Sequence, residues 1–226
     1  RGLLPARGRF FNPRRIMQRS FSRHSVRGGH ALMNTPTHAI LNLAILGRKH
    51  RPEWNVPIIW GGFIPDLALF AFFGWTTLAT DLSSQQIWGE AYYAPFWQNL
   101  FVIWNSIPLA LLGIGVGLWL RRYQQALGTT IAICCASIFL HCLEDLPLHR
   151  EDAHRHFWPL SNYRFESPVS YWDPAHHGDV FALFELGLSL AVSVYVFRLL
   201  RSRLTKALLI FSNLLFLVFF VGFYLR

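Results

Sequence analysis

The sequence has little charge and little sulfur. Charged residues make up only 15% of the 226 residues, and Asp and Glu together number 12. Hydrophobic residues make up 53%, a composition that excludes an ordinary soluble domain and favours a protein that crosses a membrane several times. The three cysteines, at positions 134, 135 and 142, all lie in one apolar segment, so a disulfide framework is not expected.

The formal net charge of +9 is concentrated at the N-terminus, because residues 1–32 hold eight arginines and no acidic residue. Subtracting these eight charges leaves +1 for the rest of the chain, so we expect no nucleic-acid partner. We interpret residues 1–32 as a basic arm outside the fold, either disordered or not native. Residues 33–226 are expected to form a single membrane-embedded helical domain.

Long apolar runs predict an all-α, polytopic membrane bundle of about five hydrophobic helices, preceded by a shorter helix at 34–47. The predicted spans are 57–78, 96–120, 126–146, 179–200 and 204–225. Two groups of glycines predict close contacts between helices, namely Gly61 with Gly62, and Gly113 with Gly115 and Gly117.

Basic residues also predict which way the chain is inserted. Basic turns at 48–51, 121–122 and 198–206 alternate with the polar segment 79–95 and the loop 147–178. The positive-inside rule places the basic turns in the cytoplasm and the loop on the opposite side. The loop is rich in aromatic residues, which indicates an ordered lid for an amphiphilic substrate.

One segment, residues 141–156, carries four histidines and four carboxylates. His141 and Asp145 are one helical turn apart and therefore share a face, and Pro147 ends the helix. The segment continues with further candidates on the loop: His149, Asp152, His154 and His156. Imidazole and carboxylate groups suit zinc, manganese or iron. A polar loop that happens to be rich in His and acid is the alternative, but the position at the end of a membrane helix favours a metal site.

Other polar residues in apolar segments converge on the same face in this topology. Asp66 lies in the middle of a span, where a carboxylate costs roughly 2.5–3.5 kcal/mol and marks either function or a hydrogen bond between helices. His38 and Asn42 share one face of the first helix. His177 is a ligand candidate or a helix-capping residue, and Glu185, two turns further on, is a candidate partner for a metal-bound histidine.

The cluster also offers groups for hydrolytic chemistry. Glu144 and Asp152 are candidate general bases, with Glu151 as an alternative. Arg150 could stabilise developing negative charge, with Arg155 as an alternative.

Several short motifs resemble the bacterial membrane-bound metal-dependent hydrolases. They are Thr37-His38-xxx-Asn42, Pro65-Asp66 and His141-xxx-Asp145, and the resemblance covers about residues 33–180. It implies that five residues bind metal: His38, Asp66, His141, Asp145 and His149. The ligand order is also loosely similar to that of zinc-dependent phospholipase C. The chain departs from the hydrolase pattern at Ala68, where a second Asp is common, and from the phospholipase pattern at Phe181, where a Glu would follow His177.

The sequence therefore predicts a membrane-embedded metal-dependent hydrolase that acts on a phosphoester or lipid-like substrate. Zinc is the preferred cofactor, with manganese or iron as alternatives, and membrane lipid is the expected partner. The expected location is the bacterial inner membrane, with the site on the non-cytoplasmic side. Two other functions stay open: a transporter of metal ions or protons, and a non-catalytic subunit or assembly factor with a structural metal.

Overall fold

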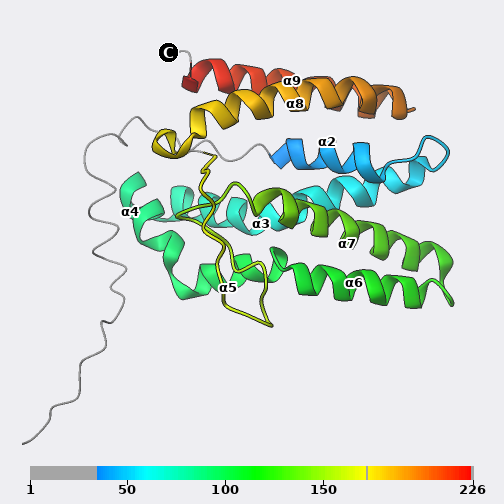
Figure 1. Ribbon diagram of the computed structural model, residues 1–226, viewed down its shortest axis with the longest axis horizontal. Helices are drawn as coiled ribbons and strands as arrows, with labels where there is room; N and C mark the ends of the chain where they lie inside the picture. Colours follow the sequence, from blue (N-terminus) through cyan, green and yellow to red (C-terminus); the bar gives the residue numbers. More distant parts are fainter. Residues whose placement is uncertain (1–34, 172, 225–226) are drawn as a thin grey trace, which may run out of the picture.

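The computed structural model describes residues 35–171 and 173–224, and every regular element among these residues is helical (Figure 1). The helices are α2 (Thr35–Leu46), α3 (Asn55–Ala79), α4 (Ser84–Gly89), α5 (Pro95–Trp104), α6 (Ile107–Leu120), α7 (Gln125–Asp145), α8 (Gly178–Leu199) and α9 (Arg203–Tyr224), with 3-10 turns at Pro52–Trp54, Ala91–Tyr93 and Pro174–His176. Four spans are long and apolar enough to cross a membrane, and α5 with α6 would make a fifth. The predicted helical membrane bundle is thus confirmed. The predicted basic arm at 1–32 lies outside the described residues.

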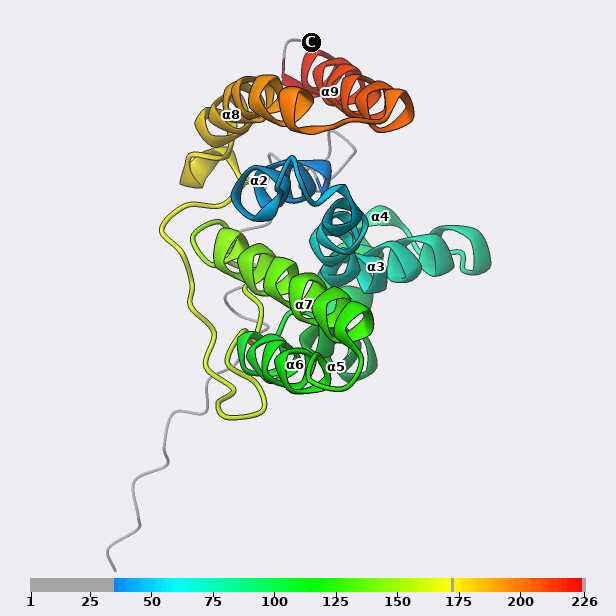
Figure 2. The ribbon, with the colours of Figure 1, turned by 90° about the vertical axis from the view of Figure 1, so that its right-hand side faces the viewer.

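The helices form layers, with the short helix α2 near the middle (Figure 2). α2 packs against α3, α7 and α8, while α7 also packs against α3 and α6. α9 lies beside α8 in the same outer layer, and α5 packs on α3. Because α2 lies between α8 and the pair α3 and α7, polar residues from all four helices can approach one another.

The predicted close contacts between helices are present at the glycine pair of α3. A Cβ atom added at Gly61 would lie 2.4 Å from the Cys134 carbonyl oxygen on α7, and one added at Gly62 would lie 2.9 Å from Ala39 Cα on α2. The missing side chains let α7 and α2 approach α3 from two sides. In α6, Gly113 and Gly117 pack closely on α7 in the same way, whereas Gly115 faces open space.

We expect Gly61→Ala to lower the stability of the bundle. The new methyl group would lie 2.5 Å from Ser137 Cβ as well as against the Cys134 carbonyl, so α3 and α7 must move apart. Overpacking of this kind costs about 1–3 kcal/mol. The midpoint of thermal unfolding in detergent should fall accordingly. Gly74→Ala is the matched control in the same helix, since a Cβ there has no neighbour within 4 Å; an equal effect of both changes would contradict the packing argument.

The span predicted at 96–120 is broken, which corrects the sequence interpretation. α5 and α6 meet at an angle of 40° around Asn105 and Ser106. Pro108 explains the break, because it has no N–H to donate to the carbonyl of Trp104 and its ring crowds that turn. The Ser106 hydroxyl accepts a hydrogen bond from Leu109 N instead, at 3.2 Å, and starts the new helix.

The polar segment at 79–95 is also more structured than predicted, since it contains α4 and a 3-10 turn. Ser83 caps α4 in a reciprocal arrangement with Gln86. Aromatic residues from this segment and α5 pack edge-on around the fully buried Phe72 of α3, among them Trp88, Tyr92 and Trp97. This aromatic cluster anchors the segment to α3.

The loop between α7 and α8 is held against α5 and against the break that follows it. Arg155 donates to Asn99 Oδ1 at 2.8 Å, and Arg164 donates to Gln98 Oε1 at 2.8 Å. Ile107 N donates to the carbonyl oxygen of His156 at 2.9 Å. These bonds fix the histidine-rich part of the loop in place.

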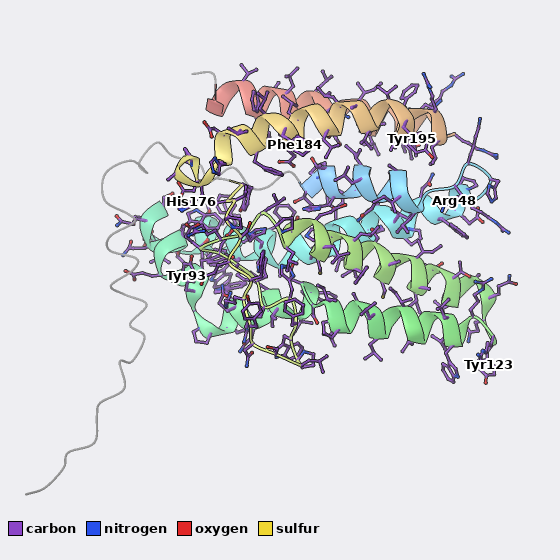
Figure 3. All side chains as sticks on the ribbon, viewed as in Figure 1. Arg48, Tyr93, Tyr123, His176, Phe184 and Tyr195 are labelled. Atoms are coloured by element: carbon purple, nitrogen blue, oxygen red, sulfur yellow. The ribbon has the colours of Figure 1, made fainter. Side chains whose placement is uncertain are left out.

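The ends of the bundle differ in charge. The turns that follow α2, α6 and α8 carry the basic clusters and lie at one end, where Figure 3 labels Arg48 and Tyr123. Tyr93 and His176 are labelled at the opposite end, together with the loop. All three basic turns therefore share one end, as the alternating pattern in the sequence requires.

Candidate metal centre

The centre of the bundle brings together two histidines and an aspartate from three helices. His38 comes from α2, Asp66 from the middle of α3 and His141 from the last turns of α7. One ligand atom from each lies within 4.8 Å of the others, and the rings of His38 and His141 are 3.8 Å apart between centroids. Both histidines are almost completely buried, whereas 19% of the Asp66 side chain is exposed. We call these three residues the first ligand group.

Asp145 lies between this group and a second one. Its Oδ2 atom is 3.0 Å from His141 Nε2, and its Oδ1 atom is 3.3 Å from His38 Nε2. Asp145 also combines with two loop histidines, His149 and His154, to form the second ligand group, whose ligand atoms again lie within 4.8 Å of one another. A single buried carboxylate thus faces both groups.

The hydrogen bonds of the histidines decide what the Nε2 atoms can do. His141 Nδ1 donates to the Gly62 carbonyl oxygen at 2.9 Å, and His156 Nδ1 donates to the Asn105 carbonyl oxygen at 3.0 Å. A carbonyl can only accept, so Nδ1 carries the proton and Nε2 keeps its lone pair. The buried Nε2 atoms of His38, His141 and His156 receive no hydrogen bond from any described residue, and the Asp145 carboxylate, 3.3 Å and 3.0 Å from the first two, has no proton to donate. A buried polar atom without a partner is costly, and a bound cation would satisfy these lone pairs.

Carboxylates hold two further histidines in the same manner. Glu144 Oε2 lies 2.5 Å from His38 Nδ1, and Asp152 Oδ2 lies 2.8 Å from His149 Nδ1. Carboxylate–histidine pairs of this kind are typical of metal sites, where the carboxylate fixes the tautomer and orientation of the ligating ring. The predicted general bases Glu144 and Asp152 are therefore arranged as orienting groups.

The loop histidines differ in charge. Burial and neighbouring imidazoles lower the pKa of His154 to about 3 and the pKa of His156 to about 4. Burial also lowers the pKa of His149, but the carboxylates of Asp152 and Asp145 outweigh it and raise the pKa to about 10. His154 and His156 therefore keep free lone pairs at neutral pH, whereas His149 holds a proton that a cation would have to displace.

Three other residues predicted for the site, Arg150, His177 and Asn42, lie outside both ligand groups. Arg150 donates to the Ser167 carbonyl oxygen at 3.0 Å, so it holds the loop together. His177, with φ 67°, precedes α8 in the left-handed region and belongs to neither ligand group. Its neighbour His176 instead joins Glu151 and Asp173 in a more exposed cluster. Asn42 donates to Ser137 Oγ at 2.8 Å, one turn beyond His38.

Some contacts in the centre involve groups that are not metal ligands and that the sequence motifs do not indicate. The carbonyl oxygens of Gly62 and Asn105 orient two imidazoles, and Thr35 donates to Asp66 Oδ2 at 2.5 Å. The one sequence signal for them was the glycine pair, which allows the close approach that exposes the Gly62 carbonyl to α7.

Comparison with protein-family models, with curated proteins and with solved structures gives no match. The resemblance to membrane-bound metal-dependent hydrolases stays a prediction.

Proposed function

We propose that the chain is a membrane-embedded, metal-dependent hydrolase of a phosphoester or lipid-like substrate. The observation that carries the proposal is the set of buried imidazole Nε2 atoms that surround the Asp145 carboxylate and receive no hydrogen bond. A divalent ion, preferably zinc, would act there as a Lewis acid and lower the pKa of water to about 7. Zinc suits the His and Asp ligands, with manganese and iron as the alternatives.

The two ligand groups would hold two ions. His38, Asp66 and His141 would hold the first, while His149 and His154 would hold the second. Asp145 faces both groups and would help to hold either ion. His156 lies beside His154, with 5.6 Å between ring centroids, and is available as a further ligand. Glu144 and Asp152 would orient His38 and His149 through their Nδ1 atoms.

The depth of the centre supports an amphiphilic substrate drawn from the membrane. Asp66 is near the middle of the 25-residue helix α3, so the first ligand group lies within the span. The most exposed carboxylates at the centre are Asp66 (19%), Glu144 (18%) and Asp152 (13%), and they mark where a polar group could reach it. By the positive-inside rule, the basic turns face the cytoplasm and the loop faces the other side, which in a bacterium would be the outer face of the inner membrane.

Transport is less well supported than hydrolysis. A transport path must continue with polar groups toward the basic end of the bundle. Asn42 and Ser137 bond to each other, and Ser137 donates to the Ile58 carbonyl oxygen at 2.6 Å. The cluster that follows is apolar and buried, and it consists of Ile40, Leu43, Ile58, Val196, Leu200 and Leu209.

The proposal is tested by purifying the full chain in detergent and measuring its metal content and its turnover of phospholipids and generic phosphoesters. We expect two equivalents of zinc, turnover that a chelator abolishes, and recovery when zinc is restored. Absence of metal from the purified chain, together with no binding of added zinc, manganese or iron, would sink the proposal. Metal binding without turnover of any substrate, with both ions fully ligated by protein, would favour the structural alternative.

Glu144→Gln is expected to weaken metal binding without unfolding the chain. The Gln amide is neutral, so it holds the His38 Nδ1 proton less strongly than the carboxylate does. The imidazole then donates less electron density to the metal, and its orientation is less well fixed. Loss of an outer partner of this kind typically costs about 10–100-fold in metal affinity. Competition with a chelator of known affinity measures the change. Glu53→Gln is the control, since that side chain is 58% exposed at the other end of the molecule; unchanged affinity in Glu144→Gln would contradict the orienting role.

A further inference from the structure

A buried carboxylate on α8 lies beside the centre but belongs to neither ligand group. Glu185 is only 6% exposed, although α8 is apolar enough to span a membrane. The Thr37 side chain hydrogen bonds to its carboxylate, but its Oε1 atom is buried and makes no hydrogen bond with any described residue. A carboxylate at this depth is costly, and such residues usually have a function.

The neighbours of Glu185 include residues that adjoin or belong to the centre. α8 packs on α2, and Thr37 is the residue before the ligand candidate His38. His38 on α2 and Asp145 on α7 are the charged groups whose electrostatic interaction reaches Glu185. The basic residues of α9, Arg203 and Lys206, lie in its first turn, at the end of the bundle that carries the basic clusters.

The other carboxylates around the centre are already engaged. Glu144 and Asp152 each bond to a histidine Nδ1, and Asp66 accepts from Thr35. Asp145 lies between the imidazoles of both ligand groups. Glu185 therefore differs from all four, because it bonds to Thr37 rather than to an imidazole, keeps one buried oxygen without a hydrogen bond, and belongs to neither ligand group.

We propose that Glu185 is the proton-transfer residue of the hydrolysis, an inference that rests on the proposed function. Its carboxylate takes one proton from the attacking water while the water oxygen forms a bond to the phosphorus or acyl carbon of the substrate. The ester bond then breaks, and the leaving oxygen receives the same proton from Glu185. The products are an alcohol and a phosphate or carboxylic acid, and the carboxylate is regenerated.

Three variants of the full chain test this assignment against metal binding and turnover. Glu185→Gln keeps the shape of the side chain but cannot accept the proton, so turnover should fall about 100- to 10,000-fold, the usual contribution of a general base. Chelator competition and the absorption spectrum of the cobalt-substituted protein should stay as in the wild type, because Glu185 is not a ligand. Glu185→Asp should recover part of the turnover. Ser189→Ala is the control one turn further along α8, since Ser189 is also buried and its Oγ is also without a partner.

Each result of this experiment supports or overturns the assignment. Turnover by Glu185→Gln within tenfold of the wild type overturns it and leaves the proposed function intact. A changed cobalt spectrum, or equal losses of metal affinity and turnover, overturns it by making Glu185 a ligand or a positioning residue. No turnover by the wild-type chain overturns both proposals. If Glu185→Gln fails to fold, Glu185→Asp decides, and wild-type turnover after the carboxylate is shortened counts against proton transfer.

Discussion

Replacement of His141 by alanine is expected to remove one of two bound metal ions and to abolish hydrolysis. His141 is fully buried, and its Nε2 lies 3.0 Å from Asp145 Oδ2 and 3.7 Å from Asp66 Oδ1. Without the imidazole, these two carboxylates would face each other with no nitrogen ligand from α7. Loss of an outer partner costs about 10–100-fold in metal affinity. Loss of a ligand should lower the affinity for the first ion by more than that.

The second ion should stay, because Asp145, His149 and His154 are untouched by this change. Metal analysis of the purified variant should therefore give one equivalent in place of two. His50→Ala is the matched control, since His50 is an exposed histidine on the turn after α2, at the far end of the molecule. Two equivalents of metal in His141→Ala would show that the first ligand group does not bind an ion.

The sequence was sufficient for the helical bundle because each span carries its own signal. The apolar runs at α3, α7, α8 and α9 are long, and hydrophobicity sets the boundaries to within a few residues. The proximity of His141 and Asp145 was also predictable, because a separation of four residues on a helix fixes the common face. Their distance of 3.0 Å agrees with this local argument.

The sequence could not predict contacts that depend on how helices dock. Glu144 lies on the same helix as His141 and Asp145, yet it bonds to His38, which is 106 positions away in the chain. Its role as an orienting group appears once α2 is docked on α7. The break between α5 and α6 has a local signal in Pro108, but its consequence, a free Asn105 carbonyl that orients His156, depends on the path of a loop some 51 positions later.

Asp145→Asn is expected to remove both metal ions while the fold is kept. The carboxylate lies 3.0 Å from His141 Nε2, 3.3 Å from His38 Nε2 and 3.5 Å from His149 Nε2, so it faces imidazoles of both groups. An amide has the same shape but no negative charge to offset the ions. Its N–H can also donate to an imidazole Nε2, which occupies the lone pair that a cation needs. Both effects act on each ligand group at once.

The metal content of Asp145→Asn should therefore fall from two equivalents to none, whereas His141→Ala keeps one. Its thermal unfolding midpoint without added metal should stay close to that of the metal-free wild type, since the amide can satisfy at least one buried Nε2 atom. Asp81→Asn, an exposed position before α4, is the control and should keep both ions. If Asp145 binds both ions, Asp145→Asn should lose both; if the two sites are independent, it should lose one. Loss of a single ion would therefore show that the two groups bind separately.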